Sequence, residues 1–177
     1  MSVRLFIAVW PPLEVVELLE KMPRPQIAGV RWTTPEQWHV TLCFLGRVEE
    51  PEEVLAAVKR TFGKGKAEGG NSEGYVARLG PATSWWGRRL LQLPVEGLSE
   101  LAAATIRATA GMGREAEERP FVGHLTLARA KRPLAVLDSL GGFRVSSSWK
   151  VTEVVVASSL TLPEGARYER LATVPLQ

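Results

Sequence analysis

The chain has 177 residues, of which 45% are hydrophobic and 23% are charged, and its formal net charge is +3. This composition excludes a disordered or low-complexity protein, and the length fits one globular domain or two small lobes that share a core. The single cysteine excludes an internal disulfide, and two histidines are too few for a standard zinc site unless carboxylates complete it. We therefore expect a cytoplasmic protein that uses no metal and no other cofactor.

The first half of the chain predicts strands and helices in alternation. Its opening apolar run, residues 3–9, is followed by Pro11-Pro12. The run is too short for a signal-peptide core or a membrane span, so a buried strand is expected and no membrane partner. Apolar spacing, prolines and glycines then predict a helix over 13–22, a short strand over 30–33, a strand around His39 that closes at Gly46, a helix over 51–62 and a strand over 75–79.

The second half repeats this order of elements. It predicts a strand over 89–93, a helix over 97–110, a strand that bears His124, a short helix over 133–140 and strands over 143–146, 151–157 and 168–174. A proline lies four residues before each histidine and an arginine eight residues after it, which indicates an internal duplication. We expect an α+β fold in which a duplicated β-α-β-α-β unit forms two lobes, related by a pseudo-two-fold axis, around a central cleft. Residues 1–177 would form one bilobal domain with approximate halves 1–80 and 85–177.

The two histidines of the chain head the same short motif. His39-Val40-Thr41-Leu42 and His124-Leu125-Thr126-Leu127 each place a threonine two residues after the histidine. The first copy continues to alternate apolar and polar residues as far as Phe44, which is the period of a half-buried strand. The alternation predicts that Cys43 faces the same way as the histidine and that Phe44 is buried in the core.

Two imidazoles that face one cleft suit general acid–base catalysis. With an unperturbed pKa of about 6.5, one ring can be neutral while the other is protonated at the same pH. A threonine hydroxyl beside each ring, Thr41 or Thr126, can donate a hydrogen bond to a phosphoryl oxygen. The set suits in-line displacement at a phosphodiester without a metal ion, and the residues alone do not say which of His39 and His124 is the acid. The run Gly63-Lys64-Gly65-Lys66 lacks the Walker spacing and is expected to be a loop.

The paired motifs resemble the HxTx signature of the 2H phosphoesterase superfamily. Within it, the chain resembles the RNA 2',3'-cyclic phosphodiesterases, historically named 2'-5' RNA ligases. The resemblance extends over nearly the whole chain, and it rests on residues 4–8, 30–32, 39–46, 119–121, 124–129 and 159–168. Two departures lie beside the motifs: Trp38 stands where a smaller apolar residue is usual, and Gly123 stands where proline is common.

The resemblance implies hydrolysis of a 2',3'-cyclic phosphate to a 2'-phosphate, with His39 as proton donor and His124 as proton acceptor. It also implies that Thr41 and Thr126 hold the phosphoryl oxygens and that Arg129 adds positive charge to the transition state. RNA with 2',3'-cyclic phosphate ends, including tRNA fragments, would be the partner of a monomeric enzyme, and 2'-5' ligation would be the same reaction in reverse. Simple alternation places Arg129 on the strand face opposite to His124, so its role requires a bulge or the end of the strand.

Two other functions remain open. Another 2H-type phosphodiesterase, acting on 2'-5' oligoadenylate or on a small cyclic nucleotide, would use the same four motif residues with a different pocket. A non-enzymatic RNA-binding module is less well supported, because binding alone gives no reason for both histidines to precede a threonine at the same spacing.

The arginine and tryptophan content bears on the partner. Sixteen of the 22 basic residues are arginine, whose planar fork suits phosphate oxygens, so an anionic partner is weakly favoured. One aromatic–basic cluster, Trp85-Trp86-Gly87-Arg88-Arg89, could contact RNA. The other four tryptophans, Trp10, Trp32, Trp38 and Trp149, are expected to pack in the core.

Overall fold

Where the structure describes the chain, it is mostly strands with three α-helices. The structure is a computed structural model, and residues 2–63, 74–114, 120–133, 140–163 and 165–176 are described. The elements are β1 (Val3–Val9), α1 (Leu13–Glu20), β2 (Val30–Trp32), the 3-10 helix η1 (Pro35–Gln37), β3 (Val40–Val48), α2 (Pro51–Phe62), β4 (Tyr75–Leu79), β5 (Ser84–Trp86), β6 (Leu90–Glu96), α3 (Ser99–Ala108), β7 (His124–Ala130), β8 (Ser147–Val151), β9 (Glu153–Leu162) and β10 (Gly165–Pro175). The predicted helix over 133–140 lies almost entirely outside the described residues.

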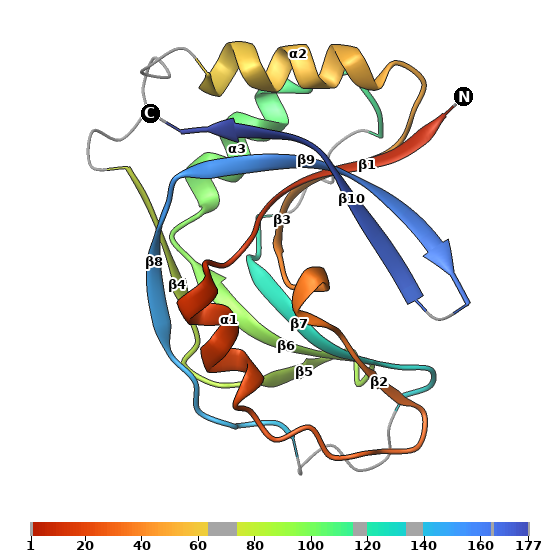
Figure 1. Ribbon diagram of the computed structural model, residues 1–177, viewed down its shortest axis with the longest axis vertical. Helices are drawn as coiled ribbons and strands as arrows, with labels where there is room; N and C mark the ends of the chain where they lie inside the picture. Colours follow the sequence, from red (N-terminus) through yellow and green to blue (C-terminus); the bar gives the residue numbers. More distant parts are fainter. Residues whose placement is uncertain (1, 64–73, 115–119, 134–139, 164, 177) are drawn as a thin grey trace.

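Helix α2 illustrates how local chemistry sets the element boundaries. Pro51 occupies the first turn, where a missing backbone N–H costs nothing. Glu52 and Glu53 follow in the first turn, and Lys59 and Arg60 lie in the last, so both helix ends carry charges that complement the helix dipole. The buried residues of α2 recur at helical spacing and form one apolar face. In Figure 1, α2 and α3 lie together at one end of the molecule.

One sheet joins the two halves of the chain, and its strand order is symmetric. The order is β10-β9-β1-β3-β7-β6-β4-β8, with β2 also paired to β7 and β5 to β6. About the centre of this order β3 corresponds to β7, β1 to β6 and β9 to β4. The repeated sequence pattern relates the first two of these pairs. The α+β class and the two-fold pattern of the strands are therefore confirmed (Figure 1).

Strands β4 and β9 each pair on the side of the sheet that is built mainly from the other half of the sequence. β4 belongs to the first half of the sequence, yet it pairs with β6 and β8 of the second half. β9 belongs to the second half, yet it pairs with β1. The repeated order of elements did not indicate this exchange, because it depends on pairing between segments that are distant in sequence.

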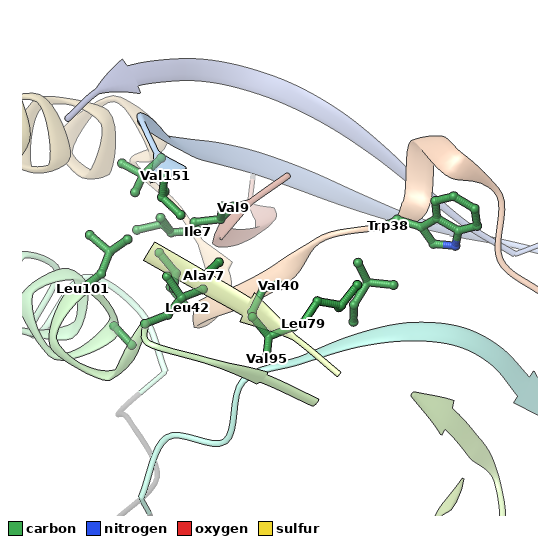
Figure 2. Packing of buried hydrophobic residues seen from close by; sticks show 14 of the residues in the cluster. Ile7, Val9, Trp38, Val40, Leu42, Ala77, Leu79, Val95, Leu101 and Val151 are labelled. Atoms are coloured by element: carbon green, nitrogen blue, oxygen red, sulfur yellow. The ribbon is translucent and has the colours of Figure 1, made fainter. Parts of the chain in front are cut away.

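A continuous core runs through both sides of the sheet. Figure 2 shows side chains of β1 and β3 packed together with side chains of β4 and β6. A second, smaller cluster lies on the opposite face of β1 and β9 and consists of Phe6, Ala8, Val155 and Ala157, with Trp10 and Tyr168 packed against it. The smaller cluster matters for function, since it lies on the face that carries the first histidine.

Bulges in β3 break the alternation that the sequence predicts. The register between β1 and β3 shifts twice, between the partners of Leu5 and Phe6 and between those of Ile7 and Ala8. As a result Cys43 is buried at 8% exposure and Phe44 is exposed at 39%, so both predicted orientations are wrong. Each extra residue turns the following side chains to the other face of the strand.

Two further findings complete the fold. The strand expected over residues 143–146 is present only as an isolated bridge between Ala82 and Arg144, and the chain becomes regular at β8 instead. In the described part of the chain, no helix has both the length and the apolar character that a membrane crossing needs.

Candidate active site

The two His-x-Thr motifs lie side by side on the central strands β3 and β7. These strands are antiparallel, and the residues that follow the two histidines, Val40 and Leu125, are partners of each other and fully buried. Continued by one residue in each direction, this register sets the threonine of each motif opposite the histidine of the other. Side chains alternate along a strand, so all four polar side chains lie on the face away from the core. These four residues are His39, Thr41, His124 and Thr126.

Both imidazole rings are held in the same way. Nδ1 of His39 lies 2.7 Å from the carbonyl oxygen of Gln37, and Nδ1 of His124 lies 3.1 Å from the carbonyl oxygen of Val122. A carbonyl only accepts, so Nδ1 carries the hydrogen in each ring. Nε2 is therefore the atom of each ring that exchanges a proton, and the backbone fixes its direction.

His39 lies in an enclosure of aromatic rings. The ring centres of Phe6 and Tyr168 are each 4.9 Å from the centre of the imidazole, and the ring centre of Trp10 is 5.1 Å away. Tyr168 presents its edge, at an interplanar angle of 84°. Above Trp10 lies the guanidinium of Arg170, 4.7 Å from the ring centre. This enclosure removes the imidazole from most of the solvent.

Burial determines the proton affinity of His39. Loss of solvent disfavours the imidazolium and lowers the pKa of His39 from 6.5 to about 4. The hydrogen bond to the Gln37 carbonyl opposes this change, and the positive charges of Arg129 and His124 add to it. These repulsions place both cationic groups near His39. In the free site at neutral pH, His39 is therefore uncharged.

His124 lies in a more open environment than His39. The ring of Trp86 meets it edge-on, with ring centres 5.5 Å apart and an interplanar angle of 87°. Trp86 itself is 45% exposed. On β6 the partner of His124 is Pro94, which contributes no polar group to the imidazole. The two histidines therefore have equivalent backbone supports and different solvent access.

A bulge in β7 brings Arg129 to the face of the motif. On β6, Gln92 pairs with Thr126 and Leu90 pairs with Arg129, and the register shifts between these two positions. Leu90 and Gln92 are two residues apart on β6 and so point to the same face. Thr126 and Arg129 must then share a face as well, although they are three residues apart. The extra residue of the bulge is Leu127, and the bulge supplies the condition that a role for Arg129 requires.

Thr33, in the segment before β3, forms hydrogen bonds to the backbone of this bulge. Its backbone N–H donates to the carbonyl of Leu127 at 2.9 Å. Its Oγ1 lies 2.8 Å from the carbonyl oxygens of both Thr126 and Leu127, so one hydroxyl hydrogen serves two acceptors. Thr33 is only 7% exposed, and buried hydrogen bonds of this kind are costly to remove. The segment before the first motif thus holds the conformation of the second.

The outer end of the β9–β10 hairpin lies beside His39. It extends past β1, as Figure 1 shows. Gln37 connects it to η1: its Oε1 accepts from the N–H of Thr34 at 3.1 Å, and its Nε2 donates to the carbonyl of Ala166. Gly165 adopts φ +139°, and a side chain on it would overlap the guanidinium of Arg31. Glycine is favoured at this position because L side chains rarely adopt a φ of this sign, and the guanidinium of Arg31 fills the space beside it.

Sequence comparison relates the chain to phosphoesterases. Residues 10–68 match the family model described as LigT like Phosphoesterase. The RNA 2',3'-cyclic phosphodiesterase of Geobacillus stearothermophilus is 27% identical over 156 residues, which are 82% of this chain and 47% of that protein. The chain therefore spans about half the length of this curated relative.

Structural comparison extends the relation to the whole chain. The Thermus thermophilus protein TT0787 superimposes with a TM-score of 0.78 at 27% identity, covering 98% of this chain and 97% of that one. E. coli LigT, solved in complex with 3'-AMP, gives a TM-score of 0.74 at 27% identity and covers 100% and 99%. In sequence and in fold the chain is thus similar to LigT-like phosphoesterases.

The five residues singled out from the sequence share one face of the sheet. The structure adds residues that the sequence did not indicate, above all the enclosure around His39. Trp10 belongs to it and packs half-buried against the smaller core cluster, whereas Trp38 and Trp149 are buried as predicted. Trp32 is half-buried against the core, and Trp86 lies beside His124.

The distribution of titratable groups completes the description of the site. Among the described residues, no three His, Cys, Asp or Glu side chains gather closely enough to hold a metal ion. The carboxylates Glu49 and Glu50 follow β3 at its far end. The charges that act on His39 are the positive charges of Arg129 and His124. The site is thus suited to an anionic ligand.

Proposed function

We propose that the chain hydrolyses 2',3'-cyclic phosphate ends of RNA to 2'-phosphomonoesters by paired-histidine acid–base catalysis without a metal ion. The observation that carries this proposal is the head-to-tail pairing of the two motifs, with both Nδ1 atoms tied to backbone carbonyls. Two proton-exchanging Nε2 atoms then flank one position, and a phosphorus atom between them can be attacked from one side and lose a group on the other. Both histidines come from one chain, so a monomer suffices.

The reaction needs one water and breaks one bond. His124 takes a proton from water on Nε2 while the water oxygen forms a bond to phosphorus. The bond from phosphorus to the ribose O3' breaks, and Nε2–H of His39 gives its proton to O3'. The product carries a 2'-phosphate and a 3'-hydroxyl. With the 5'-hydroxyl of another RNA end in place of water, the same steps join two RNA ends through a 2'-5' bond, and run in reverse they cleave that bond.

Thr41, Thr126 and Arg129 stabilise the charge that develops on phosphorus. Each threonine hydroxyl donates to a non-bridging oxygen, and the guanidinium adds positive charge at the same oxygens. The shared face of Thr126 and Arg129 supports this role, because both can then reach one phosphoryl group.

Because the pKa of His39 is low in the free site, His39 becomes protonated when substrate binds. A proton donor must be an imidazolium, and the aromatic enclosure disfavours that form in the free site. The cyclic phosphate carries a negative charge, which stabilises an imidazolium in a poorly solvated position far more than in water. Substrate binding therefore raises the pKa of His39, and the donor becomes charged when the phosphate is in place.

The named relatives support the class of substrate. The relative from Geobacillus stearothermophilus is named for 2',3'-cyclic phosphodiesterase action on RNA. E. coli LigT has been solved with 3'-AMP, with ATP, with NADP+ and with phosphate. A site that accepts nucleotides and phosphate suits the terminal nucleotide of an RNA.

The decisive experiment is product analysis. RNA that ends in a 2',3'-cyclic phosphate is incubated with the protein in excess chelator, and the terminal phosphate is located by nuclease digestion and chromatography. We expect a 2'-phosphate at an undiminished rate, with activity removed by His39→Gln or His124→Gln and retained in Arg60→Gln on α2. A 3'-phosphate product would overturn the regiochemistry, and inactivity in chelator would overturn metal-independence.

A second measurement assigns the donor. A nucleoside phosphodiester with a p-nitrophenolate leaving group needs no proton on departure, so loss of the acid costs little with that substrate. We expect His39→Gln to retain most activity on the activated ester and His124→Gln to lose it on both substrates. The opposite result would exchange the two roles.

A further inference from the structure

The face that carries His39 and Thr41 continues along β1 and β3 to a basic and aromatic surface. On this surface Phe44 lies opposite Phe6, which contacts the imidazole of His39, and Arg4 lies opposite Arg47. Arg4 is two residues from Phe6 and therefore shares its face. We refer to Arg4, Phe44 and Arg47 as the distal patch.

We propose that the distal patch binds the RNA chain on the 5' side of the cyclic phosphate, and this proposal rests on the function proposed above. A 2',3'-cyclic end has both terminal hydroxyls blocked, so the RNA continues only in the 5' direction. The patch takes nucleotides that are not themselves hydrolysed, through backbone phosphates on the two arginines and a base on Phe44.

The charge of the distal patch indicates an anionic ligand. Arg4 and Arg47 are cross-strand partners, and like charges in that arrangement repel. Within the described residues, the guanidinium of Arg4 has the Phe44 ring as its contact, at 5.5 Å, and neither arginine forms an ion pair with a carboxylate. A phosphate between two arginine forks removes the repulsion and offers both side chains acceptors that no described carboxylate supplies.

Phe44 gives the distal patch its second property. Its ring is 39% exposed on the site face, because the bulges of β3 turn it away from the core. An exposed aromatic ring beside arginines is the usual arrangement for sequence-tolerant binding of single-stranded RNA, since every base can stack on it.

Distance separates the distal patch from the reacting nucleotide. Ala8 lies opposite Thr41 on β1, and four residues of strand lead from Ala8 to Arg4. Four strand residues span about 13 Å. Groups bound at Arg4 and Arg47 therefore belong to a nucleotide other than the one whose phosphate lies between the histidines.

The test compares two substrates that share the terminal nucleotide. One is 2',3'-cyclic AMP, and the other is a single-stranded RNA octamer that ends in the same cyclic nucleotide. For Arg47→Glu we expect KM for the octamer to rise about tenfold with kcat unchanged, and the kinetics with 2',3'-cyclic AMP to stay at the wild-type level. Phe44→Leu should raise KM for the octamer alone and by a smaller factor. Arg60→Glu on α2 makes the same charge change away from the site and should leave both substrates unaffected.

Binding is measured separately from turnover. Fluorescence anisotropy of the octamer that carries a 2'-phosphate gives the affinity of wild type and variants over a range of salt concentrations. We expect Arg47→Glu to weaken binding and to reduce the slope of log affinity against log salt by about one. Equal KM changes for both substrates, or the same effect from Arg60→Glu, would overturn the distal patch. If the wild type hydrolyses neither substrate, the proposed function fails, whereas unchanged octamer kinetics and binding in Arg47→Glu refute the patch alone.

Discussion

The indole Nε1–H of Trp38 donates a 3.0 Å hydrogen bond to the hydroxyl of Thr33, and both side chains are buried. Trp38 immediately precedes His39, and Thr33 passes its own hydrogen bond to the carbonyls of Thr126 and Leu127. The two residues thus connect the start of the first motif to the bulge of the second. Trp38 was noted from the sequence as larger than usual at its position, and the hydrogen bond gives its nitrogen a partner.

Replacement of Thr33 by valine should affect stability and catalysis together. Thr33→Val keeps the shape and removes the hydroxyl, which leaves the Trp38 N–H buried without an acceptor. The free energy of unfolding should fall by about 1–3 kcal/mol. The kcat should fall more than KM rises, since Thr126 and Arg129 lose their fixed positions, and Thr33→Ser should restore both. Urea denaturation and steady-state kinetics measure the two effects.

Thr105→Val provides the comparison for that prediction. Thr105 is buried on α3, and its hydroxyl donates to the carbonyl of Leu101 at 2.8 Å. This variant loses a buried hydrogen bond far from the motifs, so stability should fall with kcat unchanged. An equal loss of kcat in both variants would show that Thr33 acts only through overall stability.

The stability of the protein should depend on pH through His39. Its pKa is about 4 in the folded protein and 6.5 when unperturbed, so the unfolded chain binds the proton more tightly. The contribution of neutral His39 is complete above pH 6.5 and is lost as the pH falls toward 4. From pH 7 to pH 5 the wild type should lose about 2 kcal/mol more than His39→Gln, in urea denaturation at the two pH values. Parallel losses in the two proteins would contradict the low pKa.

Opening the aromatic enclosure should raise the pKa of His39. Tyr168→Ala admits water to the imidazole, and the pKa should move from about 4 toward 6.5. NMR titration of the imidazole carbon-bound protons measures this directly. Trp86→Ala opens the surroundings of His124 instead and should leave the pKa of His39 unchanged. In kinetics, His39 as the acid sets the alkaline limb: kcat/KM should fall as the pH rises above about 4, and the alkaline limb of kcat should lie at higher pH, because bound phosphate raises the same pKa.

Arg129 should affect both kcat and the pKa of His39. Arg129→Gln removes the charge from the face of the site, and kcat should fall by about 10²-fold. The pKa of His39 should rise in the same variant, since the guanidinium charge now lowers it. Arg132→Gln makes the same charge change three residues later and should alter neither quantity. Activity of Arg129→Gln near the wild-type level would remove this residue from the catalytic set.

The sequence predicts those features of the site that depend on neighbouring residues. It does not predict those that depend on pairing between distant strands. The His-x-Thr repeat predicts both strands and the shared polar face, because alternation and spacing are properties of neighbouring residues. The face of Arg129 depends on a bulge that Thr33 holds from a distant segment, so alternation alone gives the opposite answer. The wrong orientations of Cys43 and Phe44 have the same origin in β3.

The aromatic enclosure depends on long-range pairing throughout. Trp10 reaches His39 because β1 pairs with β3, and Tyr168 reaches it because the β9–β10 hairpin folds back beside β1. Nothing near Tyr168 in the sequence indicates a histidine 129 positions earlier. The low pKa of His39 is consequently a property of the tertiary structure.

The exchange of β4 and β9 has a consequence for how the site is assembled. Among the six central strands of the main order, β9-β1-β3 and β7-β6-β4, each side takes two strands from one half of the sequence and the third from the other. Two copies of such a half could pair in this same order, each completing its partner. The order of these six strands is that of two half-chains that exchange one strand each. His39 and His124 hold equivalent positions in that order, and neither half alone contains both histidines.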